Sequence, residues 1–158
     1  MGFRLVNSYG NTKDVAAINM AASGVVHPGE IVDFLNTSGQ GVSPAGMNST
    51  VTTIFGVCQD YKQGASDVEV RVIPFADGQL WEADCVHAAS TAMVGLRYGL
   101  SRTRSDMALY NHASDSVTAT AVFRVVAMVG STSGSGKLLG FFRINAAGGN
   151  SPASTDAY

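Results

Sequence analysis

The sequence predicts an all-β domain, and three features of its composition and patterning indicate this. Only 14% of its 158 residues are Asp, Glu, Lys or Arg, whereas an average soluble domain has about 25%. Their place is taken by 20 Ala, 18 Val, 18 Gly, 16 Ser and 11 Thr. Val and Thr fit pleated sheets, and Gly and Ser at this density interrupt helices. Short apolar or alternating runs are separated by clusters of Gly, Pro, Asn and Ser, which is the spacing of a β-sandwich or β-barrel.

The N-terminal part of the chain predicts an arm followed by a hairpin. Residues 1–24 have weak periodicity and are expected to form the arm, with one strand around 15–20. A turn at Pro28-Gly29 leads into residues 30–35, and a glycine-rich turn then leads to residues 42–46. These two segments are expected to pair as a β-hairpin.

Two further strands are predicted in the middle of the chain. Residues 51–57 are rich in branched side chains, and Gly56 among them indicates a bulge or a close approach of backbones. Residues 68–72 alternate strictly, with three valines on one face and Glu69 and Arg71 on the other. This strand should have one face that is wet or covered by a partner.

The second half predicts mainly strands. Residues 80–85 follow the Asp77-Gly78 turn, so they are expected to pair back on the preceding strand as a hairpin. A short helix is plausible only at residues 87–93. Further strands are expected at 96–100, 107–110, 117–129 and 138–144, the last two forming a long hairpin across a Gly/Ser connection. The predicted organisation is an N-terminal arm (1–24), one β domain (25–144) and an extended Gly/Ala/Ser-rich tail (145–158).

Charge and targeting signals limit the partners. The net charge is −2 at pH 7, so attraction of the whole surface to nucleic acid or to an anionic membrane is not expected. Residues 1–85 carry 4 basic and 9 acidic side chains, and residues 86–158 carry 6 and 3. Such opposite-signed parts suit packing against copies of the chain or a partner. Residues 1–24 show no secretory signal or membrane span, and Cys58 and Cys85 are expected to be buried, unbridged thiols.

The motif search predicts no catalytic, cofactor or metal site. The Gly134-Ser-Gly-Lys137 segment lacks the first glycine and the final hydroxyl of a phosphate-binding loop. Cys85 and His87 form a Cys-x-His pair, but no recognised spacing supplies the other ligands of a zinc site. There is no Gly-x-Ser-x-Gly motif, and the carboxylate pairs match ordinary solvated residues.

Arginines gather in one segment of the second half, with an aromatic residue among them. Arg97, Tyr98, Arg102 and Arg104 lie in residues 96–105. A single-strand nucleic-acid binder uses such residues, but a negatively charged chain favours a loop that docks on an acidic protein surface through its guanidinium groups. Trp81, the single Trp, is expected to anchor the core or a subunit interface.

Short motifs follow one another between residues 24 and 144. They are Gly24-Val-Val-His-Pro-Gly-Glu-Ile-Val-Asp-Phe-Leu35, Gly39-Gln-Gly-Val-Ser-Pro-Ala-Gly46, Ile54-Phe-Gly-Val57, Val68-Glu-Val-Arg-Val-Ile-Pro74, Leu80-Trp-Glu-Ala-Asp84, Val94-Gly95 and the final hairpin. In this order they resemble the capsid decoration proteins of tailed bacteriophages, also called cement or head-stabilising proteins. The resemblance implies a small β-barrel or β-tulip-like domain without catalytic residues, which contacts several major capsid subunits on the outside of the shell.

Composition and resemblance together predict a structural virion protein of the capsid exterior, made in the bacterial host cytoplasm. Its expected partners are the major capsid protein and copies of itself, with a trimer favoured, and neither nucleic acid nor membrane. The expected contact elements are the N-terminal arm, the Arg97–Arg104 loop and the C-terminal tail. Two other functions remain open: another virion subunit, such as a tail tube or head fibre, or a carbohydrate-binding β-sandwich in which Trp81, Tyr61 or Tyr98 stacks on a sugar.

Overall fold

The structure is a computed structural model that describes residues 2–7, 16–19, 25–34, 42–45, 49–50, 53–63, 68–76, 78–85, 89–103, 106–114, 121–130 and 137–142. At 16–19, 34, 102–103 and 106–114 the backbone alone is described. In these ranges the regular structure consists of thirteen β-strands and one short 3₁₀ turn. All strand pairs are antiparallel. The predicted all-β, barrel-like class is confirmed.

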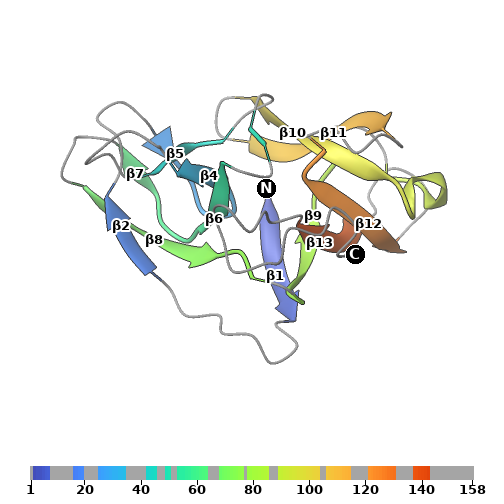
Figure 1. The fold of residues 1–158 in the computed structure, drawn as a ribbon, viewed down its shortest axis with the longest axis horizontal. Helices are drawn as coiled ribbons and strands as arrows, with labels where there is room; N and C mark the ends of the chain where they lie inside the picture. The colour runs from blue at the N-terminus through green and yellow to red at the C-terminus, as the bar shows by residue number, and fades with distance from the viewer. Residues whose placement is uncertain are drawn as a thin grey trace.

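The larger sheet has six strands and forms one half of the molecule (Figure 1). In spatial order its strands are β1 (Phe3–Asn7), β9 (Leu80–Ala83), β13 (Lys137–Phe142), β12 (Phe123–Val129), β10 (Arg97–Thr103) and β11 (Asp106–Ser114). The predicted final hairpin is confirmed, because β12 and β13 pair along their length.

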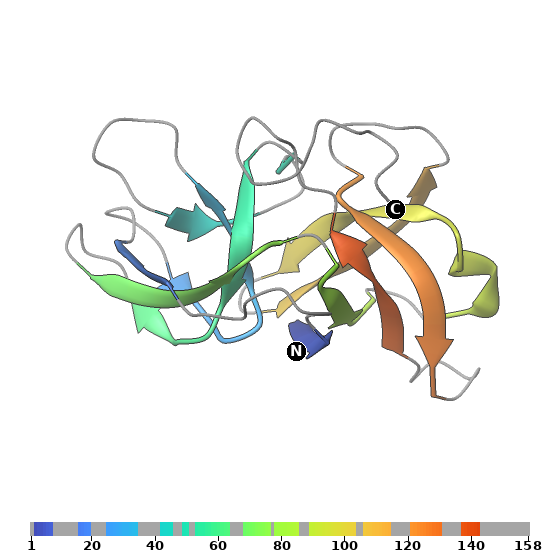
Figure 2. The ribbon, with the colours of Figure 1, turned by 60° about the horizontal axis from the view of Figure 1, so that its bottom comes forward.

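The second sheet has five strands and curls together with a short ribbon in the other half (Figure 2). Its order is β2 (Ala16–Asn19), β8 (Glu69–Pro74), β6 (Ile54–Cys58), β4 (Ile31–Phe34) and β5 (Val42–Pro44), and the ribbon is β3 (Val25–Val26) with β7 (Lys62–Gln63). The pairing of β4 with β5 confirms the first predicted hairpin. A Cβ at Gly56 would collide with the Ile73 carbonyl group of β8, which confirms the predicted close approach of backbones on β6.

The curled half has a small core of its own. On β8 the residues Val70 and Val72 are fully buried while Glu69 and Arg71 are exposed, as the strict alternation predicts. The cluster is made of valines and one cysteine, with the half-buried Phe55 packed against them. Its buried members are Val26, Val32, Val42, Cys58, Val70 and Val72.

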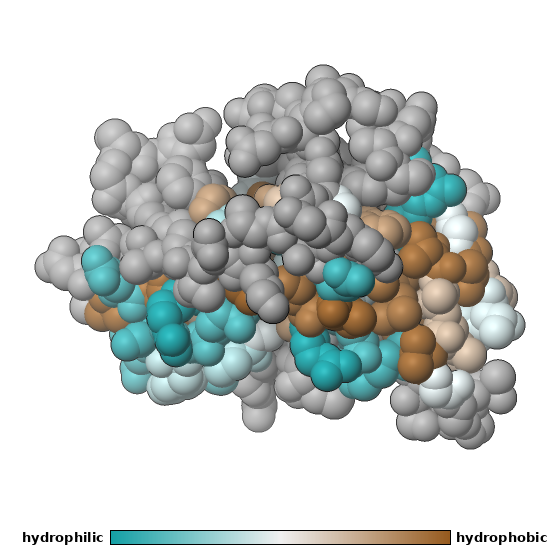
Figure 3. Space-filling view, turned by 90° about the horizontal axis from the view of Figure 1, so that it is seen from below, coloured by the Kyte–Doolittle hydropathy of each residue, from teal (hydrophilic) through white to brown (hydrophobic). Residues whose placement is uncertain are grey.

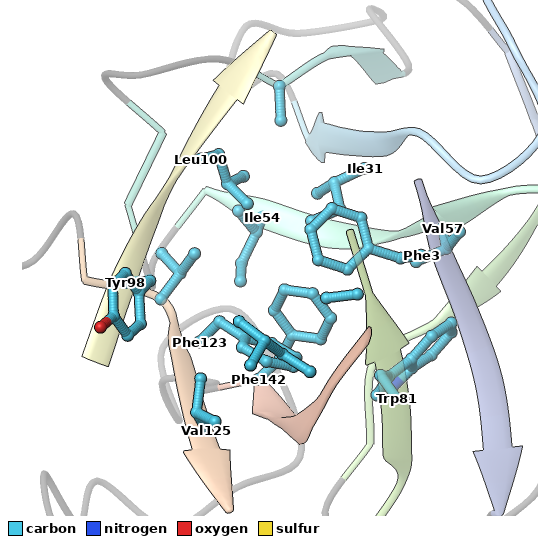
Figure 4. Packing of buried hydrophobic residues seen from close by; sticks show 14 of the residues in the cluster. Phe3, Ile31, Ile54, Val57, Trp81, Tyr98, Leu100, Phe123, Val125 and Phe142 are labelled. Carbon is cyan, nitrogen blue, oxygen red and sulfur yellow. The ribbon is translucent and has the colours of Figure 1, made fainter. Parts of the chain in front are cut away.

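The main core lies between the inner face of the six-stranded sheet and the curled sheet, and it is aromatic (Figure 4). Phe142 is at its centre. Its ring centroid lies 4.1 Å from that of Phe75, 4.8 Å from Phe123, 5.2 Å from Phe3 and 5.9 Å from Trp81. Tilted and edge-on aromatic pairs of this kind add roughly 0.5–1.5 kcal/mol each beyond area burial.

The connection from β8 to β9 passes between the two sheets and corrects one prediction. Gln79 is buried there; its Oε1 accepts the Ala76 N–H at 2.9 Å and its Nε2 donates to the Pro74 carbonyl at 3.2 Å. β8 pairs with β2 and β6, and β9 pairs with β1 and β13. The predicted hairpin between these two segments is therefore wrong: the turn is present, with Gly78 at φ +77°, but both strands find partners that are distant in sequence.

Three other segments differ from expectation. Residues 97–103 are strand β10 between β11 and β12, so the arginine-rich segment is not a loop over that range. The expected short helix at 87–93 is reduced, in its described part, to the 3₁₀ turn Thr91–Met93. In the N-terminal segment the expected strand is β2, and β1 is a second strand that was not predicted; the tail at 145–158 lies outside the described residues.

Candidate protein-binding surface

The outer side of β12 and β13 is apolar, although the core covers only the inner side of these strands. Phe123 and Phe142 face each other in register on the inner side, so their neighbours Arg124 and Phe141 face each other on the outer side. A solvated antiparallel sheet ordinarily alternates apolar residues inward with polar residues outward. We call the apolar outer surface the β12–β13 face; it consists of Val126, Ala127, Val129, Leu139 and Phe141.

The β12–β13 face is open to solvent in the isolated chain. Val126 and Val129 are 40% and 48% exposed, and Leu139 and Phe141 are half-buried. A space-filling view from below shows a continuous apolar area beside a hydrophilic one (Figure 3). Apolar patches of this kind on soluble proteins mark interaction sites.

Charged residues border this face next to β13, and they are paired with one another. Arg4 on β1 and Glu82 on β9 are directly opposite and form an ion pair of 3.0 Å, and Glu82 is opposite Leu139 in the next register step. The Lys137 ammonium forms an ion pair with Asp84. The exposed Arg4–Glu82 pair adds little to stability, whereas Asp84 is only 8% exposed. Both pairs give the apolar face a polar rim, which is the usual anatomy of an interface.

Two arginines lie side by side at the other border. Arg97 on β10 and Arg124 on β12 are opposite in the antiparallel register, and both side chains lie on the outer side because their neighbours Tyr98 and Phe123 point into the core. Arg97 is only 8% exposed and Arg124 is half-buried, so Arg124 is the more accessible of the two. Arg is enriched at protein interfaces, where its planar group bonds carboxylates and stacks on rings.

The sequence-predicted site residues are separated by the structure. Trp81 and Tyr98 are each 1% exposed and belong to the main core, so Trp81 is a core anchor within this chain. Arg97 borders the β12–β13 face. The backbone of Arg102 lies in β10, and its side chain and the whole of Arg104 lie outside the described residues. Of the three aromatic residues considered for sugar stacking, only Tyr61 is exposed, at 58%.

The buried carboxylate of Glu30 belongs to a tight turn between β3 and β4. The Glu30 N–H donates to the His27 carbonyl at 3.1 Å, and Gly29 has φ +87°. The fully buried Glu30 carboxylate in turn accepts the His27 backbone N–H at 2.8 Å. The Tyr61 ring packs 5.1 Å from the His27 ring. These groups hold the turn against the curled sheet.

A half-buried carboxylate, Asp33 on β4, holds the segment before β6. It accepts the hydroxyl of Thr53 at 3.1 Å and that of Ser49, and burial raises its pKa despite these two bonds. Burial also raises the pKa of the Cys58 thiol to about 11, and a thiol that stays protonated is a poor nucleophile. Both thiols are unbridged as predicted, and Cys85 is half-buried against the main core.

Sequence reasoning missed the residues that form the β12–β13 face. The sequence does indicate this face through two unbroken apolar runs, because residues 125–129 and 138–142 are apolar at every position. A strand that is covered on both sides has such a sequence, but the runs by themselves predict only strands. Among the described residues, no group of three or more His, Cys, Asp or Glu is placed to hold a metal ion.

No protein family, curated protein or solved structure matches this chain. Within the described ranges, none of the helical structure is long and apolar enough to cross a membrane. The fold and the β12–β13 face together describe an all-β domain with a surface suited to binding protein.

Proposed function

We propose that this chain is a structural virion protein that binds the outer surface of a phage capsid lattice and stabilises it by bridging major capsid subunits. The observation that carries the proposal is the second apolar face of β12 and β13. Phe141 and Leu139 expose apolar surface that the core does not use. Covering such surface releases roughly 25 cal/mol per Å², which drives protein association.

The remaining support comes from composition and from the resemblance of residues 24–144 to capsid decoration proteins. The chain has few charges to solvate its surface. Two of its described buried polar side chains, Glu30 and Gln79, hold turns by hydrogen bonds. Binding to a repeated lattice turns modest contacts into high avidity when several subunits are engaged at once.

The test is binding to shells assembled from the major capsid protein of the phage that encodes this chain. Wild type and an L139S/F141S variant are mixed with shells, and the bound fraction is measured by co-sedimentation. We expect at least a tenfold loss of affinity for the variant, and wild-type binding should raise the temperature at which the shells disrupt. The matched control is Y61S, which removes an exposed aromatic ring from the curled half and should bind as wild type does.

Three results would overturn the proposal. They are an absence of wild-type binding, equal binding by L139S/F141S, and loss of binding in Y61S alone. Glycan binding that depends on Tyr61 would favour the carbohydrate-binding alternative. Density for the chain on the tail of the particle in an electron-microscopy map would favour the other virion subunits.

A further inference from the structure

The two sheets have four edge strands, and one of them differs from the others. β5 has three residues and ends at Pro44, β2 has four residues, and β1 has five. Part of the β1 edge is already bonded, because the Phe3 N–H donates to the Gly29 carbonyl at 2.8 Å. β11 has nine residues and is the longest strand in the described part of the chain.

β11 also has few of the features that keep an edge strand from pairing, and over residues 106–110 its register with β10 is regular. Soluble proteins protect edges with short strands, prolines, charged side chains or bulges. Asp106–Ser114 contains no proline, and Asp106 is its one charged residue. The register with β10 is regular over five consecutive pairs, from Gly99 opposite Tyr110 to Thr103 opposite Asp106, and the irregularity lies at the other end.

Among the described residues no strand pairs with β11 on the side away from β10, so this edge presents a row of backbone donors and acceptors. In the described part of the chain β10 is the one strand paired with it. Every second residue of an edge strand directs its N–H and C=O groups away from the sheet, and such a row binds another strand by extending the sheet.

We propose that β11 pairs with β11 of a second copy of this chain, antiparallel and across a twofold axis. A twofold axis lets two identical edges satisfy each other, since residue i meets residue j and j meets i. It also separates the one charge on each edge. If the regular stretch 106–110 pairs with itself, the two Asp106 residues lie roughly 14 Å apart at about 3.4 Å per residue, whereas parallel pairing would place them side by side.

The pair has a geometrical consequence for the proposed function. Antiparallel strands of one sheet are related by a twofold axis perpendicular to that sheet, so both copies keep the same side up. The result is a continuous sheet of twelve strands, six from each copy, with both β12–β13 faces on the same side. A dimer of this form would bind one partner surface through its two β12–β13 faces. This last step rests on the proposed function, whereas the pairing of the two β11 strands does not.

The first measurement is the mass of the free chain in solution over a range of concentrations. Sedimentation equilibrium should give twice the 16.4 kDa of one chain. A monomer at every concentration overturns the pairing. A trimer, which the resemblance favoured, overturns it as well, because a twofold pair yields even numbers of copies.

The second measurement places the contact on β11. A108P and L109P each remove one of two consecutive backbone N–H groups, of which one faces β10 and the other faces the free edge. Proline is tolerated in an edge strand where its nitrogen faces outward. One variant should stay folded and become monomeric, and the other should be destabilised. A17P and A16P on edge strand β2 are the matched controls, and the folded one of these should remain dimeric.

Hydrogen exchange of the wild type decides the case if both β11 variants fail to fold. In a dimer all amides of the regular stretch 106–110 are protected, whereas in a monomer alternate amides of this stretch exchange quickly. Protection that rises with protein concentration supports the pairing, and alternate fast exchange in a dimeric sample overturns it. Co-sedimentation with shells tests the proposed function separately from the pairing. If the monomeric variant binds shells with lower avidity, the proposed function stands. If the dimeric wild type binds no shells, the proposed function is overturned and the pairing is not.

Discussion

Phe141 and Phe142 are consecutive residues of β13 whose rings lie on opposite sides of the six-stranded sheet. Phe142 is 4% exposed and stacks on Phe75 with ring centroids 4.1 Å apart. Phe141 faces Arg124 on the outer side and is half-buried. Two residues of the same type, next to each other in the chain, therefore have different roles: Phe142 stabilises the fold, and Phe141 is available to a partner.

F142A should lower the free energy of unfolding by about 3–5 kcal/mol, because it removes the central ring of the main core and leaves a cavity. F141A should lower it by less than about 1 kcal/mol, since a half-buried ring outside the core is lost. Urea unfolding followed by fluorescence of the buried Trp81 measures both. Equal losses in the two variants would show that Phe141 also supports the fold.

Local patterns predicted most of the strands but not their partners. The strict alternation of residues 68–72 predicted the buried and exposed positions of β8 correctly, because a single face of that strand is covered. The pairing of β9 was not predictable from the turn before it. The Gln79 side chain makes hydrogen bonds with the backbone of the turn, where the chain passes from one sheet to the other. The contacts that select β13 as the partner of β9 are distant in sequence.

Composition predicted the type of surface better than its location. The arginine-rich segment suggested a loop, but Tyr98 and Leu100 alternate inward, and residues 97–103 are a strand between β12 and the edge strand β11. Trp81 was expected at the core or at an interface, and packing on Phe75 places it in the core. The candidate surface instead uses Leu139 and Phe141, whose run gave no polar residue by which to tell the two sides apart.

G140A and G95A should separate steric conflict from backbone strain. A Cβ at Gly140 would collide with the Arg124 carbonyl and lie 2.6 Å from the Phe123 ring, so β12 and β13 would have to move apart. Gly95 has φ +88°, and a Cβ added there would meet nothing within 4 Å, so strain alone acts at this position. We expect losses of roughly 3 kcal/mol or more for G140A and about 1–2 kcal/mol for G95A. Thermal unfolding measures both, and a larger loss in G95A would contradict the close approach at Gly140.

The two thiols should differ in reactivity. Cys58 is fully buried, donates to the Asp60 carbonyl at 3.0 Å and has a pKa raised to about 11 by burial. Cys85 is half-buried. Alkylation of the native chain at neutral pH, read by mass spectrometry, should therefore modify Cys85 first and leave Cys58 unmodified until the chain unfolds. The control variant C85S should take up no label under the same conditions, and rapid labelling of C85S would show that the small core opens.

Two carboxylates should affect stability in opposite directions with pH. Burial raises the pKa of Asp33 above its ordinary 3.8, so the folded chain favours the protonated form, and stability falls as the pH rises from 3.8 through the raised pKa. Hydrogen bonds from Arg71 lower the pKa of Asp60 below 3.8. Asp60 therefore adds stability above 3.8 that is lost as the pH falls through the lowered pKa.

D33N and D60N test these signs, because each removes one titrating group. The free energy of unfolding of D33N, relative to that of wild type, should be higher at neutral pH than below pH 3.8, because D33N no longer pays the cost of ionising the Asp33 carboxyl in the folded chain. D60N should show the reverse, with its disadvantage largest at neutral pH, where the ion pair with Arg71 is fully formed in wild type. Urea unfolding at a series of pH values gives both differences, and comparing differences removes the pH-independent effect of each substitution. The same sign of pH dependence in both variants would contradict the burial of Asp33.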